Sequence, residues 1–366
     1  MRTLLVSGGS GGHLVPAMEL ADHLQATDRC FLMCTRRPVD RIFSADGSSS
    51  FEWETVDLQP FTPFWRWLSL PYGARQIGGI RKVFKVIGKT KPDVVVGFGG
   101  YMSGIGVMAA RAAGIPTVIH EQNFIPGRAN RFLAAFASAV AVSFPETGRY
   151  LRQKEKVEVT GNPMRIRAGT ATVEEARAAF GFDSKRPVLL IAGGSQGSRP
   201  VNRLVLRMWQ AASPEQRGRV QVLHLAGPCA EEVEQAYRRL DGIKAVVIAF
   251  LRRMDLALAS ATMAVSRAGA TAIAEMAVMA VPSILIPYPY AAAHQRANAQ
   301  WVQDIGGAVL LEEDGLSPER LRQEVERLLD DPAQMDRMRQ ALRSHSDGTA
   351  AARLGDLVRK TAGEKR

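Results

Sequence analysis

The sequence has few of the residues that build disulfide frameworks, metal centres or membrane spans. Its 366 residues include three cysteines, Cys30, Cys34 and Cys229, and their spacing excludes a disulfide scaffold and a structural zinc site. No uncharged apolar run reaches the roughly 18 residues of a transmembrane helix. The chain enters an apolar run directly after its first two residues, so we expect no signal peptide.

Acidic residues are also in short supply. The 47 lysines and arginines outnumber the 36 aspartates and glutamates, which gives a net charge of +11. Such a surplus indicates an anionic partner, namely nucleic acid, an acidic membrane surface or a phosphorylated substrate, although a basic surface can also serve solubility alone. We expect no nucleic acid, because the sequence has no basic–aromatic repeat. With 46% hydrophobic residues, a chain of this length predicts two globular domains.

Strand-length apolar runs alternate with helical patterns throughout the chain. This alternation predicts an α/β protein with parallel sheets covered on both faces. The chain also repeats itself weakly, since LLVSGGSGGH at 4–13 resembles LLIAGGSQGS at 189–198. The repeat predicts two doubly wound halves, each opening with a ligand-facing loop, and a boundary within 159–169. The predicted strands lie within 3–9, 30–35, 93–100, 116–123, 139–144, 187–194, 220–227, 244–251, 261–269 and 282–288.

The first glycine loop, GGSGGH at 8–13, does not fit the common nucleotide motifs. It lacks the lysine of a Walker A loop, and Leu14 stands where a strict GxGxxG has its third glycine. Arg36 and Arg37 replace the usual acidic residue after the second strand, so the loop alone leaves an NADP enzyme open. A simple tight turn is the other interpretation, with Pro16 at the start of the following helix.

The second loop, GGSQGSRP at 193–200, is more specific. Its glycines allow close approach of a ligand, and the following helix N-terminus forms an anion site. Downstream, Glu275 lies one to two turns inside another predicted helix, where it could accept hydrogen bonds from ribose hydroxyls or simply face solvent. Gln295 and Asn298 share a helix face, as suits a sugar ligand, although ordinary helix polarity explains them equally well.

Together these motifs resemble those of the MurG family, the peptidoglycan enzymes that transfer N-acetylglucosamine (GlcNAc) from UDP-GlcNAc to lipid I. The resemblance implies a GT-B fold, in which two Rossmann-like, doubly wound, parallel-sheet domains face a cleft. It implies an acceptor and membrane-binding domain at 1–161, a UDP-sugar donor domain at 162–340, and a helix at 341–366 that returns to the first domain. The shared motifs are GGSGGH, GFGGYMSG (97–104), HEQN (120–123), GNPMR (161–165), GGSQGSR (193–199), SRAGATAIAE (266–275) and the His-Gln-x-x-Asn cluster at 294–298.

The resemblance also implies which residues bind the substrates. In the donor half, the backbone at Leu251 would read uracil, Ser195 would hold a phosphate, and Gln295 would address the sugar. The segment 270–275 would take diphosphate at its start and ribose at Glu275. In sequence order its residues are Ala270, Thr271, Ala272, Ile273, Ala274 and Glu275. From the other half, the sugar-phosphate end would meet Ser10, Gly11, Gly12, Asn123 and Arg165.

The implied reaction is a single displacement with inversion at the sugar. It needs a base for the attacking hydroxyl and stabilisation of the leaving diphosphate. His13 is the first candidate for the base, and Glu121 is the alternative, as base or as the group that orients an imidazole. A purely structural or binding role for both residues is the remaining interpretation. We expect His120 to be structural. No acidic metal-binding motif stands near a predicted donor loop, so helix N-termini would stabilise the charge, and we expect neither metal nor cofactor.

The stretch 61–91 mixes aromatic and basic residues, as interfacial surfaces do, although domain core is the other interpretation of its aromatics. We expect it to dock on anionic phospholipid and to place the protein peripherally at the cytoplasmic face of the membrane, where lipid I lies. A GT-B transferase for another glycolipid acceptor, such as diacylglycerol, is the alternative function. The expected membrane patch comprises Phe64, Trp65, Trp67, Arg81, Lys82, Phe84 and Lys85.

Overall fold

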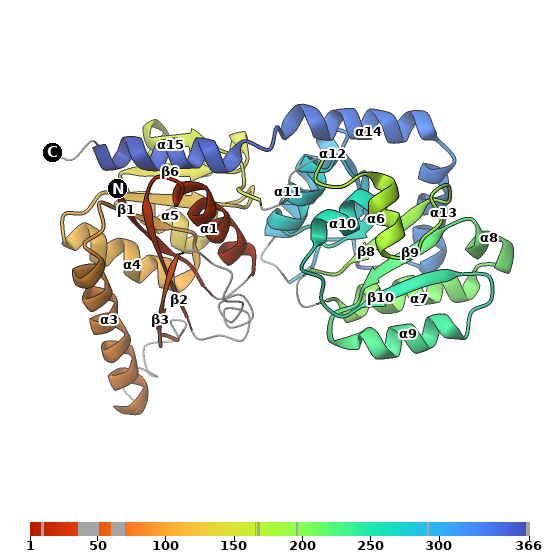
Figure 1. Cartoon of the computed structure of the whole chain (residues 1–366), viewed down its shortest axis with the longest axis horizontal. Coiled ribbons are helices and arrows are strands. Elements are labelled where there is room, and N and C mark those ends of the chain that lie inside the picture. Colours follow the sequence, from red (N-terminus) through yellow and green to blue (C-terminus); the bar gives the residue numbers. More distant parts are fainter. Residues whose placement is uncertain are drawn as a thin grey trace. The chain divides into compact units, whose positions relative to one another are not determined.

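The chain forms two α/β units, each built on a wholly parallel sheet (Figure 1). The structure, a computed structural model, describes residues 1–8, 11–35, 51–59, 70–164, 166, 169–194, 197–290 and 293–363. Unit 1 comprises Met1–Arg165 and Thr349–Arg366, and unit 2 comprises Ile166–Gly348.

The described part of unit 1 contains a seven-stranded sheet in the order β3-β2-β1-β4-β5-β6-β7. Its strands are β1 (Arg2–Val6), β2 (Arg29–Thr35), β3 (Glu52–Val56), β4 (Val94–Gly97), β5 (Thr117–Glu121), β6 (Ala139–Val142) and β7 (Val157–Val159). Its helices are α1 (Gly11–Leu24), α3 (Leu70–Thr90), α4 (Gly100–Ala112), α5 (Arg128–Leu133), η2 (Pro145–Tyr150), η3 (Lys154–Lys156) and α15 (Ala350–Gly363).

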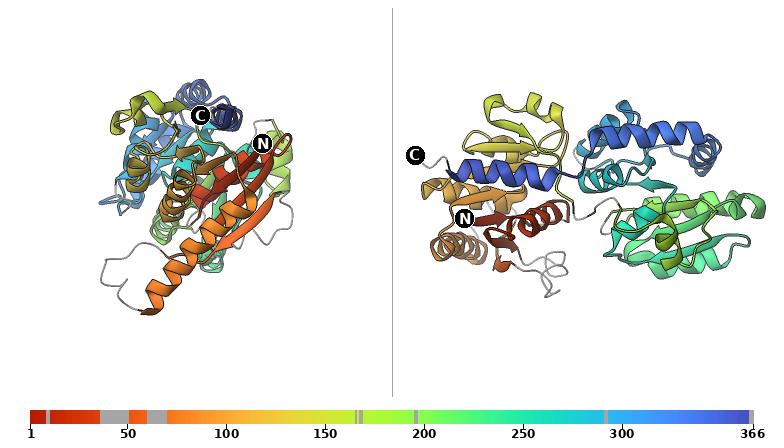
Figure 2. Two further views of the ribbon diagram at one scale, coloured as in Figure 1. Left: turned by 90° about the vertical axis from the view of Figure 1, so that its left-hand side faces the viewer. Right: turned by 45° about the horizontal axis from the view of Figure 1, so that its top comes forward.

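Helices cover both faces of this sheet. Successive residues of a strand point to opposite faces, so neighbouring residues of one strand pack against different helices. Leu5 of β1 packs in a cluster with residues of α1 and α15, whereas Leu4 and Val6 pack with residues of α3 and α4. Helix α5 lies beside α4 on the same face of the sheet. Helix α15 follows all of unit 2 in the chain, yet it lies against α1 (Figure 2).

The described part of unit 2 contains a six-stranded sheet in the order β10-β9-β8-β11-β12-β13. Its strands are β8 (Val188–Ala192), β9 (Gln221–Leu225), β10 (Lys244–Ile248), β11 (Met263–Ser266), β12 (Ser283–Leu285) and β13 (Ala308–Leu310). Its helices are α6 (Val173–Ala179), α7 (Arg199–Ala211), α8 (Pro214–Gly218), η4 (Gly227–Cys229), α9 (Ala230–Arg238), α10 (Met254–Ser260), α11 (Ala270–Val278), α12 (His294–Asp304), α13 (Pro318–Leu329) and α14 (Pro332–His345).

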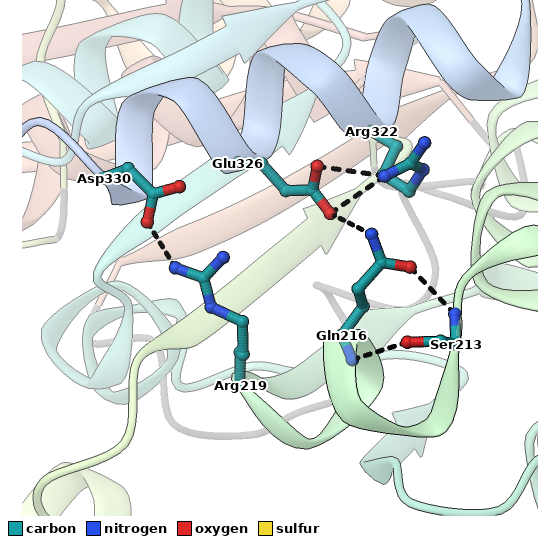
Figure 3. Close-up of polar contacts among 6 residues, drawn as sticks. All are labelled: Ser213, Gln216, Arg219, Arg322, Glu326 and Asp330. Atoms are coloured by element: carbon teal, nitrogen blue, oxygen red, sulfur yellow. Dashed lines mark hydrogen bonds and ion pairs between the residues drawn. The ribbon is translucent and has the colours of Figure 1, made fainter.

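Polar contacts join α8 to α13 at the surface of unit 2 (Figure 3). The Glu326 carboxylate accepts hydrogen bonds from Gln216 Nε2 at 3.0 Å and from Arg322 Nη1. Gln216 also closes a capping box with Ser213 at the start of α8. These contacts fix a short helix that has no buried residue of its own.

Each sheet reverses its strand order at one point, between β1 and β4 in unit 1 and between β8 and β11 in unit 2. In open α/β sheets, ligands bind beyond the carboxyl ends of the strands at such a switch point. The loop after β1 runs into the first turn of α1, and the loop after β8 runs into α7. The fold therefore places the two glycine loops at equivalent positions of the two units.

Candidate active site

In unit 1, His13 lies at the switch point between β1 and β4. A Cβ atom on Gly99 would lie 3.1 Å from His13 Nε2, and one on Gly100 would lie 3.7 Å from His13 Nδ1. Both glycines have positive φ, at 96° and 76°, which side chains disfavour. The GFGGYMSG motif therefore provides a side-chain-free wall for the imidazole.

Helix α1 begins at Gly11, not at Pro16, so the expectation that proline starts this helix is wrong. The first turn is built by Gly11 and Gly12 with His13, and Pro16 lies inside the helix. Sequence reasoning favoured Pro16 because proline suits a first turn. Glycine at these two positions instead places no side chain in the first turn.

His13 is half-buried, and burial lowers the pKa of its imidazole below 6.5. The negative charge of Glu121 and a hydrogen bond with the Gly8 backbone act in the opposite direction, but burial has the larger effect. His13 is therefore mostly neutral at neutral pH. A neutral imidazole can accept a proton, as a general base must.

The Glu121 carboxylate is buried and held by four hydrogen bonds. Its Oε1 accepts from the Asn123 backbone N–H at 2.9 Å and from Asn123 Nδ2 at 3.1 Å. Its Oε2 accepts from Gly127 N and Asn130 Nδ2, both at 2.9 Å. These four donors hold the carboxylate in one orientation.

His120 is fully buried and satisfied at both ring nitrogens. Its Nε2 lies 2.9 Å from the Gly161 carbonyl oxygen, and its Nδ1 lies 3.0 Å from Gln122 Nε2. Burial lowers its pKa to about 4. The expected structural role of His120 is confirmed by these contacts.

In unit 2, the second glycine loop is shaped by close backbone contacts. A Cβ atom on Gly193 would lie 2.4 Å from the Ser198 backbone nitrogen, and one on Gly197 would lie 2.6 Å from the Ala226 carbonyl oxygen. Gly194 and Gly197 also have positive φ, at 91° and 69°. Ser198 then forms the N-cap of α7. Only glycine fits the two crowded positions of this loop.

Helix α11 begins immediately beyond β11 with no side-chain cap at Gly269. Its first residues, Ala270 to Ala274, carry short or apolar side chains. Between one and two turns in, Glu275 is half-buried and has no hydrogen-bond partner among the described residues. Burial raises the pKa of its carboxyl to about 7. An open helix N-terminus followed by an unpaired carboxyl suits a ligand with phosphate at one end and hydroxyls at the other.

The other residues expected to bind the donor have different surroundings. Gln295 Oε1 accepts from the Tyr288 backbone N–H at 2.9 Å, and its Nε2 has no partner in the described part of the chain. Asn298 is fully buried, and its Nδ2 donates to the Ala268 carbonyl at 3.2 Å. Asn298 thus supports the turn before α11 from beneath. Leu251 lies after β10, partly buried against the core of unit 2.

Several expected site residues lie outside the residues that the structure describes. They are Ser10, Arg165 and Ser195, and Phe64, Trp65 and Trp67 of the membrane patch. Two residues that sequence reasoning missed stand out instead. Asn130 holds Glu121, and Arg267, directly after β11, binds Ser198. The sequence signal that could have identified Arg267 is its position between an apolar strand and the start of a helix that suits an anion.

Within the described ranges, no group of three or more histidine, cysteine, aspartate or glutamate side chains could hold a metal ion. Of the helices that the structure describes, none combines the length and apolar character of a membrane span.

Two family models match successive parts of the chain. Residues 3–142 match the glycosyltransferase family 28 N-terminal domain, and residues 188–354 match the family 28 C-terminal domain. Among solved structures, MurG of Acinetobacter baumannii superposes with a TM-score of 0.75 at 25% identity, over 98% of this chain and 99% of that one. The fold and these matches define a GT-B glycosyltransferase of family 28.

Relatives that match over the full length narrow the class further. A UDP-N-acetylglucosamine--N-acetylmuramyl-(pentapeptide) pyrophosphoryl-undecaprenol N-acetylglucosamine transferase from Clavibacter sepedonicus is 35% identical, over 97% of this chain and 95% of its own. A transferase of the same name from Halothermothrix orenii is 34% identical, over 99% of both chains. The chain belongs to the MurG family, as its motifs predicted.

Proposed function

We propose that this protein transfers GlcNAc from UDP-GlcNAc to the MurNAc 4-hydroxyl of lipid I and so makes lipid II for peptidoglycan synthesis. Its full-length relatives carry the name of that activity. The structural observation that carries the proposal is the uncapped start of α11 with the unpaired Glu275 behind it, since that pair suits a nucleoside diphosphate.

The donor lies along one edge of unit 2 in this proposal. The start of α11, at Ala270, faces the diphosphate, and Glu275 accepts hydrogen bonds from the ribose hydroxyls. Gln295 offers its Nε2 to the sugar, and the backbone at Leu251 reads uracil. Ser195, with Ser10 and Arg165, is assigned to the phosphates and the sugar on the family resemblance alone, and Gly11, Gly12 and Asn123 complete the expected contacts.

His13 is the proposed general base. Its lowered pKa keeps the imidazole neutral, and Gly99 and Gly100 present no side chain to it. Glu121 is assigned a supporting electrostatic role, because four donors hold its carboxylate in place and its charge acts on His13. Its fixed negative charge favours the imidazolium that forms when His13 accepts a proton.

The reaction then proceeds in one displacement. His13 removes the proton from the 4-hydroxyl of MurNAc as that oxygen attacks the anomeric carbon of GlcNAc. The bond to the β-phosphate breaks with inversion, and UDP leaves as the anion. Amides at the start of α11 stabilise the charge that develops on the diphosphate, since such preorganised donors act most strongly where charge appears.

The face of unit 1 covered by α3, α4 and α5 is the proposed membrane contact. These three helices contain no acidic residue. Phe84 on α3 is 48% exposed and Phe132 on α5 is 61% exposed. The basic side chains Arg81, Lys82 and Lys85 have no acidic partner in the described chain. Exposed rings among unpaired cations suit an anionic phospholipid surface, at which a peripheral enzyme would meet lipid I.

One assay of substrate pairs tests the proposed reaction. UDP-GlcNAc, UDP-glucose and UDP-galactose, each with a labelled sugar, are supplied separately with lipid I or with diacylglycerol. We expect labelled product only from UDP-GlcNAc with lipid I. Product with diacylglycerol and none with lipid I would instead identify a transferase for another glycolipid.

A further inference from the structure

Arg267 is a buried cation at the switch point of unit 2, between the end of β11 and the start of α11. It is 5% exposed, and the proposed reaction assigns it no task. An arginine beside an anion-binding loop would ordinarily be taken for a phosphate ligand. Its contacts point to a different role.

The guanidinium binds three separate segments of unit 2. Its Nε and Nη2 donate to Ser198 Oγ at 3.1 and 2.9 Å. Its Nη1 donates to the carbonyl oxygens of Ile286 and Pro287 at 3.1 and 3.2 Å and forms an ion pair with Glu313. The guanidinium carbon also lies 5.5 Å from the centre of the Tyr288 ring.

These contacts leave Arg267 little capacity for a phosphate. A guanidinium has five N–H groups. The two on Nη1, the one on Nε and one of the two on Nη2 already have partners. The neighbouring carboxylate of Glu313 offsets the positive charge. A diphosphate would therefore have to displace existing bonds in order to bind this side chain.

The segments that Arg267 joins are those that would hold the diphosphate and the sugar of a nucleotide sugar. Ser198 closes the glycine loop and caps α7. Tyr288 follows Pro287 directly and fixes Gln295 through its backbone N–H. Arg267 is thus the common support of the loop assigned to phosphate and of the side chain assigned to the sugar.

We propose that Arg267 is a positioning residue for the donor, which holds the glycine loop and the 286–288 segment in register with Glu313 as its counter-ion. This role rests on the proposed binding of UDP-GlcNAc to unit 2. Arg267 makes no contact with the diphosphate in this proposal.

Replacing its counter-ion distinguishes the two roles of Arg267. If Arg267 positions the site, Glu313→Gln loosens it and raises the Kd for UDP-GlcNAc, measured by calorimetry, about fivefold or more. If Arg267 is instead a phosphate ligand, the same substitution frees its charge and lowers the Kd. A Kd that is unchanged or lower overturns the proposal. Glu312→Gln is the matched control, because Glu312 pairs with Arg296 at the surface, and its Kd should stay within about twofold.

A second measurement uses the shared bond to Ser198. Arg267→Lys should raise KM for UDP-GlcNAc about 10-fold or more while kcat changes by less than about threefold, because positioning of the donor is lost rather than the base. Adding Ser198→Ala to Arg267→Lys should cost little more, since both remove the same contact. Independent, multiplying effects would contradict the proposal. Absence of UDP-GlcNAc binding by the unsubstituted protein would instead refute the proposed function itself.

Discussion

Some titratable side chains with shifted pKa values have hydrogen-bond partners in the described chain, and one has none. His120 and His224 are buried with both ring nitrogens bonded, and their pKa values fall to about 4 and about 3. Glu275 has a shifted pKa but no hydrogen-bond partner in the described chain. Saturated groups hold the fold together, whereas an unpaired buried group keeps its bonding capacity for a ligand.

Substitution of His13 tests the base. His13→Ala should lower kcat about 10²- to 10⁴-fold with the Kd for UDP-GlcNAc nearly unchanged, because proton removal is lost but donor binding is not. Steady-state kinetics with lipid I and calorimetry with the donor measure the two quantities. Loss of donor binding at an unchanged kcat would contradict the assignment.

Glu275 predicts a pH dependence of donor binding. Only the ionised carboxylate accepts from both ribose hydroxyls, and its pKa of about 7 means that it protonates as the pH falls through neutrality. The Kd for UDP-GlcNAc should therefore rise up to about tenfold from pH 8 to pH 6. Calorimetry across this range measures it. Glu275→Gln should bind more weakly at pH 8 and lose this slope, and a slope retained in that variant would refute the role of Glu275.

At the scale of elements, both glycine loops connect a buried strand to a helix, and their glycines have different tasks. Gly194 and Gly197 share a positive φ, but only Gly197 faces another backbone segment. Among the described residues, a Cβ atom at Gly194 would meet nothing within 4 Å. Substitutions at these two glycines therefore compare the cost of backbone strain alone with the cost of strain plus a steric clash.

Gly197→Ala should be more damaging than Gly194→Ala. Both variants carry the strain of a side chain at positive φ, about 1 kcal/mol, whereas the Gly197 variant must also displace the turn at Ala226. We expect a loss of about 2–3 kcal/mol in the free energy of unfolding for Gly197→Ala, and a raised KM for UDP-GlcNAc. Chemical denaturation and donor kinetics measure these effects. Equal losses in the two variants would show that the contact with Ala226 is unimportant.

Much of this element-level organisation could be predicted from the sequence. Uninterrupted runs such as 93–97 become buried parallel strands, and the repeated glycine loops fall at equivalent strand ends. Strand β3 (Glu52–Val56) was not predicted, because its alternating charged residues at an exposed sheet edge carry no continuous apolar signal. The donors around Glu121 could not be predicted either, since Gly127 and Asn130 reach the carboxylate only through the tertiary path of the chain.

At the scale of the molecule, the helices differ in how many of their basic residues have acidic neighbours. Helices α3, α4 and α5 carry basic residues with no acidic ones, whereas α13 neutralises its arginines with its own glutamates. The expected fold class and family are confirmed by the two parallel sheets and the full-length relatives. The roles of individual residues remain proposals.

Reversal of one charge on α3 tests the membrane contact. Lys85→Glu should weaken co-sedimentation with vesicles containing phosphatidylglycerol about fivefold or more, since each basic residue near such a surface contributes about 1 kcal/mol. Lys360→Glu makes the same change on α15, which covers the other face of the sheet, and should have little effect. Equal effects of the two variants would indicate that net charge alone governs binding.

The return of α15 to unit 1 has a consequence for biosynthesis. The hydrophobic cluster between α1 and the sheet includes three residues of α15, namely Leu354, Leu357 and Val358. The ribosome adds these residues only after all of unit 2. Unit 2 is contiguous and can fold while translation continues. Unit 1 must wait with an incomplete hydrophobic layer, which reverses the usual N-terminal-first order of domain folding. Nascent chains stalled before residue 349 should therefore expose α1 to chaperones and proteases.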